Sequence, residues 1–248
     1  MLKATISLSP SKVGACKNCP RCFYDAIHYD IETPRGIFPS LPGGVDRVMK
    51  DMMDANRLTW PTQLAKEMAG RTLWGTVSQM NKLRNWKSGL RVTMPISVSI
   101  DGAEKTVTVE VIGALDDLAI EANGQFSPYD TKTKGSEPSD AGLQYYQHQL
   151  DLYALMLRAN KMPPSGKGYL AYWYPVDMAS GSLSFAVKLY EVTADAERGV
   201  QWLRDTVAVL LGRRPESHAK CEYCKLASAR CRLERSFDAQ PSDLTLSA

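Results

Sequence analysis

The chain has 248 residues, of which 44% are hydrophobic and 23% are charged, a composition that is ordinary for a globular protein. No apolar run is long enough to cross a bilayer, which excludes a membrane-spanning helix. The formal net charge of +3, from 30 Lys and Arg against 27 Asp and Glu, is too small to indicate a nucleic-acid partner by itself.

The N-terminal segment MLKATISLSPSK lacks the apolar stretch of a secretory signal, so we expect a cytoplasmic protein. In that compartment the six cysteines favour metal ligation or redox chemistry over disulfide bonds.

The first third of the chain is predicted to be mainly helical. Ser9-Pro10-Ser11 begins a helix over residues 12–31 that Pro20 interrupts, and the segment TPRGIFPSLPGG is typical of an extended loop. Apolar residues then recur at helical spacing over 45–57, and residues 60–87 predict one or two further helices.

The middle of the chain changes to the alternating pattern of half-buried strands. Two turn dipeptides, Asp101-Gly102 and Asn123-Gly124, separate strand candidates. The predicted strands cover residues 92–100, 107–111, 115–121, 126–133, 168–174 and 182–192, with helices over 139–160 and 195–211. This order predicts a mixed α/β domain built around one sheet.

The cysteines lie at the two ends of the chain. The stretch 16-CKNCPRC-22 holds three of them, and Cys221, Cys224 and Cys231 follow about 200 residues later. One or more N-terminal cysteines with the C-terminal three would form a four-thiolate metal site. Spacing alone favours zinc because C-x2-C pairs are commonest at zinc sites, and an iron–sulfur cluster is the alternative.

Asp130 and Lys132 lie two residues apart on a predicted strand, so their side chains share one face. Such a pair is most often an ordinary ion pair on a sheet. It can also be half of a phosphodiesterase site, which needs carboxylate ligands for Mg²⁺ or Mn²⁺ and a fixed cation near the phosphate. The context favours the second interpretation, because Asp116 lies on the preceding strand and Gln149 and Tyr153 share a face of the next helix.

The ordered motifs Gly113-Ala114-Leu115-Asp116, 130-DTKT-133 and 149-QLDLY-153 resemble those of the PD-(D/E)XK nuclease superfamily. The resemblance is to its RecB-type branch, with the CRISPR-associated RecB-like exonucleases and the nuclease domain of AddB. The opening residues 8–25, which contain CPRCFYD, also resemble the N-terminal helix of that branch. The resemblance implies an α/β fold with a restriction-endonuclease-like core, a central mixed sheet flanked by helices.

The resemblance also implies the roles of individual residues. Asp116 and Asp130 would bind Mg²⁺ or Mn²⁺ together with the carbonyl of Thr131. Lys132 would be the catalytic lysine, with Gln149 and Tyr153 positioning it or the DNA. Asp117 points to the opposite face of the strand from Asp116 and is not expected to bind the metal.

One position departs from the pattern of the branch. Many relatives have a metal-binding histidine on a helix after a glycine, and here Gly43-Gly44-Val45-Asp46 places an aspartate there. Asp46 could serve as an oxygen ligand in its stead, whereas His28 is expected to be structural.

The iron-bearing relatives hold a [4Fe–4S] cluster with one N-terminal and three C-terminal cysteines. The resemblance therefore implies a mainly structural cluster on Cys19, Cys221, Cys224 and Cys231 that joins the chain ends. Cys16 and Cys22 would then be spare thiols.

Several basic residues are candidates for DNA binding. Lys134 shares the face of Asp130 and Lys132, and further cations interleave with Trp74 and Trp86, namely Arg71, Lys82 and Arg84.

These observations predict a single nuclease domain over residues 1–235, with a helical insertion at about 45–88, cluster-forming ends at 16–22 and 221–231, and a disordered tail at 236–248. We expect a metal-dependent exonuclease acting on single-stranded DNA or DNA ends, in CRISPR adaptation or DNA repair, with protein partners in such a complex. The alternative is a DNA-binding or assembly module that keeps the fold and the cluster with little activity.

Overall fold

The structure, a computed structural model, describes residues 5–34 and 40–238. Its helices are α1 (Pro10–Asn18), α2 (Pro20–His28), α3 (Ser40–Ala55), α4 (Val77–Arg84), α5 (Leu143–Ala159), α6 (Ala196–Leu211) and α7 (Glu222–Asp238), and a 3₁₀ turn, η1 (Asp140–Gly142), precedes α5. Its strands are β1 (Thr5–Leu8), β2 (Thr72–Leu73), β3 (Leu90–Ile100), β4 (Ala103–Gly113), β5 (Asp117–Ile120), β6 (Phe126–Thr133), β7 (Lys167–Ala179) and β8 (Ser182–Thr193).

The N-terminal helices begin and end at residues suited to those positions. Ser9 caps α1, and its hydroxyl accepts a hydrogen bond from the Lys12 amide at 3.2 Å. Cys19 ends α1 and caps α2, where Pro20 occupies the first helical position. The interruption predicted at Pro20 is therefore confirmed.

Within the described residues the strands form two sheets, so the mixed α/β class is confirmed and the prediction of one sheet is wrong. The first sheet has the order β1-β4-β3, and the second has the order β2-β5-β6-β7-β8. The β3–β4 hairpin turns at Asp101 and Gly102, which both have a positive φ (51° and 81°), as the dipeptide predicted. The chain leaves the first sheet at Gly113 and enters the second at Asp117, so the Gly113–Asp116 motif lies at the junction.

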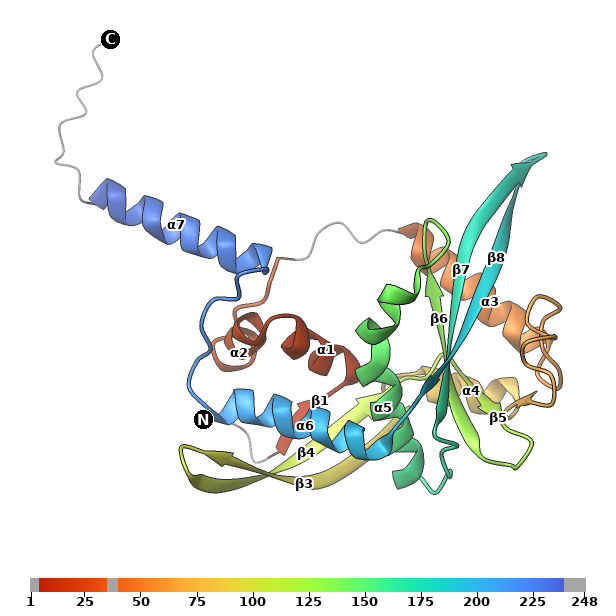
Figure 1. The fold of residues 1–248 in the computed structure, drawn as a ribbon, viewed down its shortest axis with the longest axis horizontal. Helices are drawn as coiled ribbons and strands as arrows, with labels where there is room; N and C mark the ends of the chain where they lie inside the picture. The colour runs from red at the N-terminus through yellow and green to blue at the C-terminus, as the bar shows by residue number, and fades with distance from the viewer. Residues whose placement is uncertain (1–4, 35–39, 239–248) are drawn as a thin grey trace, which may run out of the picture.

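Helix α5 is the crossover between the parallel strands β6 and β7, which makes the second sheet mixed. Every residue from Leu150 to Leu157 is buried, because α5 packs between the two sheets (Figure 1). Gly113 allows this close approach, since a Cβ there would lie 2.3 Å from the Met156 Cε atom of α5. The glycine of the G-x-x-D motif thus has a packing reason.

The five-stranded sheet is covered on both faces. Leu118, Leu170 and Tyr172 contribute to the core that includes α5, whereas Tyr129, Ala171 and Trp173 pack with the α3 side. The helices α3 and α4 lie largely within the range 45–88 of the predicted insertion, although α3 already begins at Ser40. Residues 61–70 between them form turns rather than a helix, and β2 then adds an edge strand to β5.

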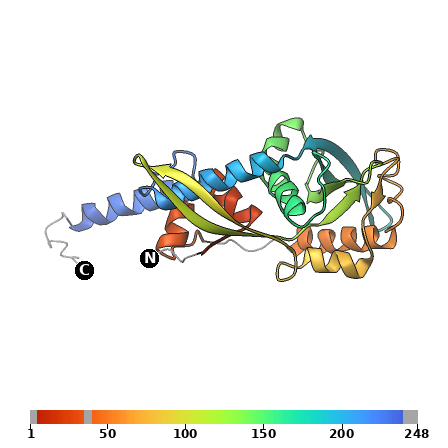
Figure 2. The ribbon, with the colours of Figure 1, turned by 90° about the horizontal axis from the view of Figure 1, so that it is seen from below.

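The two views show a long molecule (Figures 1 and 2). Helices α1, α2, α6 and α7 lie toward one end, and α3, α4 and the five-stranded sheet lie toward the other. Within the described residues, no helix is both long and apolar enough to cross a membrane. The disordered tail was predicted over residues 236–248. Residues 236–238 belong to α7 instead, and residues 239–248 lie outside the described part.

Candidate active site and cysteine group

The candidate catalytic residues come together where β5, β6 and α5 meet. Asp116 directly precedes β5, and its Oδ2 atom accepts a hydrogen bond from the Thr131 amide of β6 at 3.1 Å. Asp130 and Lys132 form an ion pair on β6. The two carboxylates and the lysine therefore belong to one contiguous cluster.

Gln149 of α5 holds this cluster together. Its amide nitrogen donates to Asp130 Oδ1 at 2.8 Å, and its amide oxygen accepts from Lys132 Nζ at 3.2 Å. The same nitrogen lies 3.0 Å from the Tyr153 hydroxyl, which donates to the Ala114 carbonyl at 2.8 Å. Both partners of the ion pair are thus fixed by the helix that crosses behind them.

Asp130 is buried, and its chemistry fits a metal ligand. Its Oδ2 atom accepts no hydrogen bond from the described residues and has Lys132 as its ion-pair partner. Burial raises the pKa of Asp130 to about 7; the Lys132 charge opposes this effect and the Asp116 charge adds to it. A divalent cation at this oxygen would compensate the buried charge, and carboxylate and carbonyl oxygens are the ligands that Mg²⁺ and Mn²⁺ prefer.

A second lysine, which the sequence interpretation missed, lies at the same site. Lys50 of α3 places its Nζ atom 2.8 Å from Asp46 Oδ2 and 3.1 Å from Asp116 Oδ1. Burial lowers the pKa of Lys50, but the charges of Asp116 and Asp46 outweigh this effect, so the pKa is raised overall. Asp46 therefore reaches the site through Lys50. The spacing of Asp46 and Lys50, four residues apart on one helix, was the available clue.

Asp117 points away from this cluster, as the strand alternation predicted, and forms a buried ionic network. Its carboxylate accepts two hydrogen bonds from the Arg57 guanidinium, at 2.5 and 2.6 Å, and one from Arg84 at 2.9 Å. Arg84 also donates to the Asp116 backbone carbonyl at 2.8 Å and to Asp54 at 2.7 Å. This network fixes the backbone that carries Asp116.

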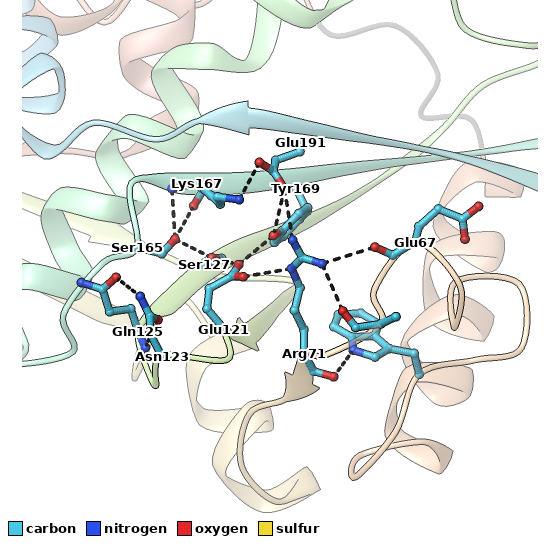
Figure 3. Close-up of polar contacts among 12 residues, drawn as sticks. Glu67, Arg71, Glu121, Asn123, Gln125, Ser127, Ser165, Lys167, Tyr169 and Glu191 are labelled. Carbon is cyan, nitrogen blue, oxygen red and sulfur yellow. Dashed lines mark hydrogen bonds and ion pairs between the residues drawn. The ribbon is translucent and has the colours of Figure 1, made fainter.

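Two of the basic residues expected to bind DNA have other partners. Arg84 is the guanidinium of the buried network just described. Arg71 donates to Glu121 at 2.9 Å and to Glu191 at 3.2 Å, and Tyr169 and Ser127 also donate to Glu121 (Figure 3). These arginines tie the 56–84 segment to the sheet because their donors have internal partners, and a contact of either arginine with DNA stays a prediction.

The other two candidates, Lys82 and Lys134, have exposed side chains. Two aromatic residues lie close to cations, Trp86 from the predicted basic and aromatic segment and Tyr146, which was not predicted as a site residue. Trp86 is 65% exposed with Lys87 near its ring, and the Tyr146 ring lies 4.3 Å from Lys132 Nζ.

Four cysteines from the two ends of the chain form one group. The sulfur atoms of Cys19, Cys22, Cys221 and Cys224 all lie within 4.8 Å of one another. The Sγ–Sγ distances are 3.6 Å for Cys19–Cys224, 3.6 Å for Cys22–Cys221 and 3.7 Å for Cys22–Cys224. Thiolates at such distances can bind a metal, so this group joins the N- and C-terminal segments as expected.

The membership of the group differs from the expected set in one residue. Cys22 takes the place that was assigned to Cys231. Cys22 follows Cys19 by three residues across the start of α2, which brings both thiols to one side. Cys231 lies seven residues beyond Cys224 on α7, about 10 Å along the helix axis, and is exposed. Cys16 stays outside the group as predicted, and burial raises its pKa to about 11.

Comparison with known proteins identifies the family. The sequence profile of the PD-(D/E)XK nuclease superfamily matches residues 40–232, which is most of the chain. No curated protein matches the sequence. Among solved structures, the crystal structure of SSO0001 is similar over 92% of this chain and 87% of that chain, with 15% identity and a TM-score of 0.46. Similarity at that level is too low to support an inference. The profile match and the assembled acidic and lysine cluster show that the chain belongs to the PD-(D/E)XK nuclease superfamily.

Proposed function

We propose that the protein is a Mg²⁺- or Mn²⁺-dependent deoxyribonuclease. The observation that carries this proposal is the bonded cluster of Asp116, Asp130, Lys132 and Gln149, which β6, α5 and the connection before β5 bring together. Family membership supports the same conclusion.

The residues of the cluster have separate roles in this proposal. Asp116 and Asp130 hold the metal ion, with the Thr131 carbonyl as a further ligand. When bound, the ion activates water and stabilises the negative charge that develops on the phosphate. Lys132 places its positively charged ammonium next to the attacking water or the phosphate and donates a hydrogen bond to it. Gln149 keeps the Lys132 ammonium in place, and Tyr153 anchors Gln149 to the Gly113–Asp116 segment.

We further propose single-stranded DNA or DNA ends as the substrate and an exonuclease mode, acting in the cytoplasm in DNA repair or CRISPR adaptation. The motif resemblance to the RecB-type branch supports this. Exposed Lys82 and Lys134 are suited to contact the phosphate backbone, and exposed Trp86 is suited to stack on an unpaired base.

Replacing Lys132 with Met tests the proposed function. We expect cleavage of labelled single-stranded DNA in Mg²⁺ or Mn²⁺ to slow by about 10²–10³-fold, because one preorganised cation is lost from the transition state. Lys167→Met is the matched control, since Lys167 lies at the start of β7 and pairs with Glu191 in a network separate from the site. A Lys132→Met variant that cuts as fast as the wild type contradicts the assignment.

A second candidate function is DNA binding with little cleavage. It is favoured by Lys50, which already neutralises the Asp116 carboxylate that a metal ion would use. DNA binding by the wild-type protein with no cleavage in any divalent cation would support this alternative.

Lys50 and Asp46 give a separate prediction about metal affinity. We expect Lys50→Met to bind Mn²⁺ about tenfold more tightly than the wild type, because the metal no longer displaces an ammonium from Asp116. Asp46→Asn should not weaken Mn²⁺ binding, whereas Asp116→Asn should. Electron paramagnetic resonance of free Mn²⁺ measures these affinities, and Lys50→Arg serves as the charge-preserving control. Equal losses of Mn²⁺ affinity in Asp46→Asn and Asp116→Asn would contradict this prediction and would identify Asp46 as the third metal ligand that the resemblance implies.

A further inference from the structure

The cysteine group is built from two similar halves. Cys19 and Cys22 form one C-x2-C pair, and Cys221 and Cys224 form the other. In each half the first cysteine directly precedes a helix, α2 or α7, and the second lies in its first turn. The structure therefore assembles two plus two ligands, in contrast to the one plus three that the resemblance implies.

The distances between the sulfur atoms distinguish a single ion from a cluster. An ion with metal–sulfur bonds of about 2.3 Å at the centre of a tetrahedron sets its sulfur atoms about 3.8 Å apart. The observed separations of 3.6, 3.6 and 3.7 Å are close to that value. A [4Fe–4S] cluster binds each thiolate to a different iron, so its cysteine sulfurs must lie further apart. All four sulfurs here lie within 4.8 Å of one another, which does not fit a cluster of four irons.

The surroundings of the group suit a compact set of thiolates. The Cys22 amide points to the Cys19 sulfur at 3.4 Å. The N-terminal ends of α2 and α7 both lie at the group. Helix N-termini stabilise negative charge, so they favour the thiolate form of these cysteines.

The chain ends are also held together by contacts that do not involve sulfur. Arg214 forms an ion pair with Asp25 of α2 at 2.6 Å, and Arg21 donates to the Pro215 carbonyl at 2.7 Å. These contacts join the connection between α6 and α7 to α2. The group is therefore positioned by the fold as well as by any bound ion.

We propose that Cys19, Cys22, Cys221 and Cys224 bind one zinc ion, and that the chain ends are joined by this mononuclear site. All four positions are taken by protein sulfur, which is typical of structural zinc sites. Cys231 has no part in the site, and zinc has no redox chemistry to offer there. The role of the ion is structural, because it links the N-terminal segment that contains α2 to the C-terminal segment that contains α7.

Metal analysis of the intact protein tests this proposal. We expect protein purified without oxygen to contain about one zinc ion per chain and to lack broad visible absorbance. Cys22→Ser should lose the zinc, whereas Cys231→Ser should keep it in full. These two variants are a matched pair, because they remove one thiol each from the competing ligand sets.

Two results would overturn the proposal. One is about four irons per chain with a broad visible spectrum. The other is loss of metal from Cys231→Ser with retention in Cys22→Ser. If Cys22→Ser does not fold, Co²⁺-substituted wild-type protein decides, since tetrahedral thiolate coordination gives intense cobalt absorption and any other coordination rejects the site.

Discussion

Asp130→Asn is expected to abolish metal-dependent DNA cleavage and, at pH 8 without added divalent cation, to raise the melting temperature of the protein. The variant removes a buried negative charge, since Asp130 is 1% exposed. Its amide still offers an oxygen to Gln149, but it no longer supplies a carboxylate for the metal. In this proposal, the buried carboxylate lowers the stability of the protein and is retained because it binds the metal.

The stability gain should depend on pH in a defined direction. Burial raises the pKa of Asp130 from an ordinary 3.8 to about 7, so the folded state binds this proton more tightly than the unfolded state. The stability from that proton is present at low pH and is lost as the pH rises from about 4 to about 7. The melting temperature of Asp130→Asn should therefore exceed that of the wild type more at pH 8 than at pH 5.

Thermal melting of both proteins across this range measures the effect. Asp177→Asn is the control because it makes the same substitution at an exposed position on β7, away from the buried site, and it should not reproduce the gain in melting temperature at pH 8. A variant that is less stable than the wild type at pH 8 would mean that the Lys132 ion pair outweighs the cost of burial.

Asp117→Ala is expected to destabilise the protein by about 3–5 kcal/mol, because it removes the more buried of the two carboxylates that Arg57 and Arg84 share and leaves them only Asp54. The side chains of Arg57, Arg84 and Asp117 are 8%, 10% and 2% exposed. For a domain of this size the melting temperature should fall by about 6–20 °C. Cleavage should also fall, since Arg84 fixes the backbone of Asp116.

The surface pair of Arg91 and Glu110 provides the comparison. Its atoms are 3.2 Å apart and its side chains are 42% and 31% exposed. Glu110→Ala should cost about 1 kcal/mol or less, because water screens and solvates both groups. Equal small losses in both variants would show that the buried network contributes little. Melting curves of the three proteins give the answer.

Local patterns in the sequence predicted most of the elements that form the site. The alternation over 126–133 and the helical stripe over 139–160 gave β6 and α5, and with them the shared faces of Asp130 with Lys132 and of Gln149 with Tyr153. These relations follow from the periods of strands and helices. The division into two sheets was not visible, because strand pairing joins segments that lie far apart in the sequence.

The sequence could not predict contacts between residues that lie far apart along the chain. The ion pairs of Arg84 and Arg71 were not predicted, because their partners Asp117 and Glu121 lie 33 and 50 residues away. The choice of Cys231 over Cys22 came from the pattern of relatives. The local clue was the C-P-R-C spacing, which turns both sulfurs toward the start of α2.

The two-ended cysteine group constrains how the protein is made. A ribosome releases β6 and α5, with the acidic and lysine cluster, well before it releases Cys221 and Cys224. Cys19 and Cys22 therefore lack the other two members of the group until nearly the whole polypeptide has been synthesised. Binding of the proposed zinc ion would therefore be a late event in biogenesis, and a truncated translation product would contain the acidic and lysine cluster without Cys221 and Cys224.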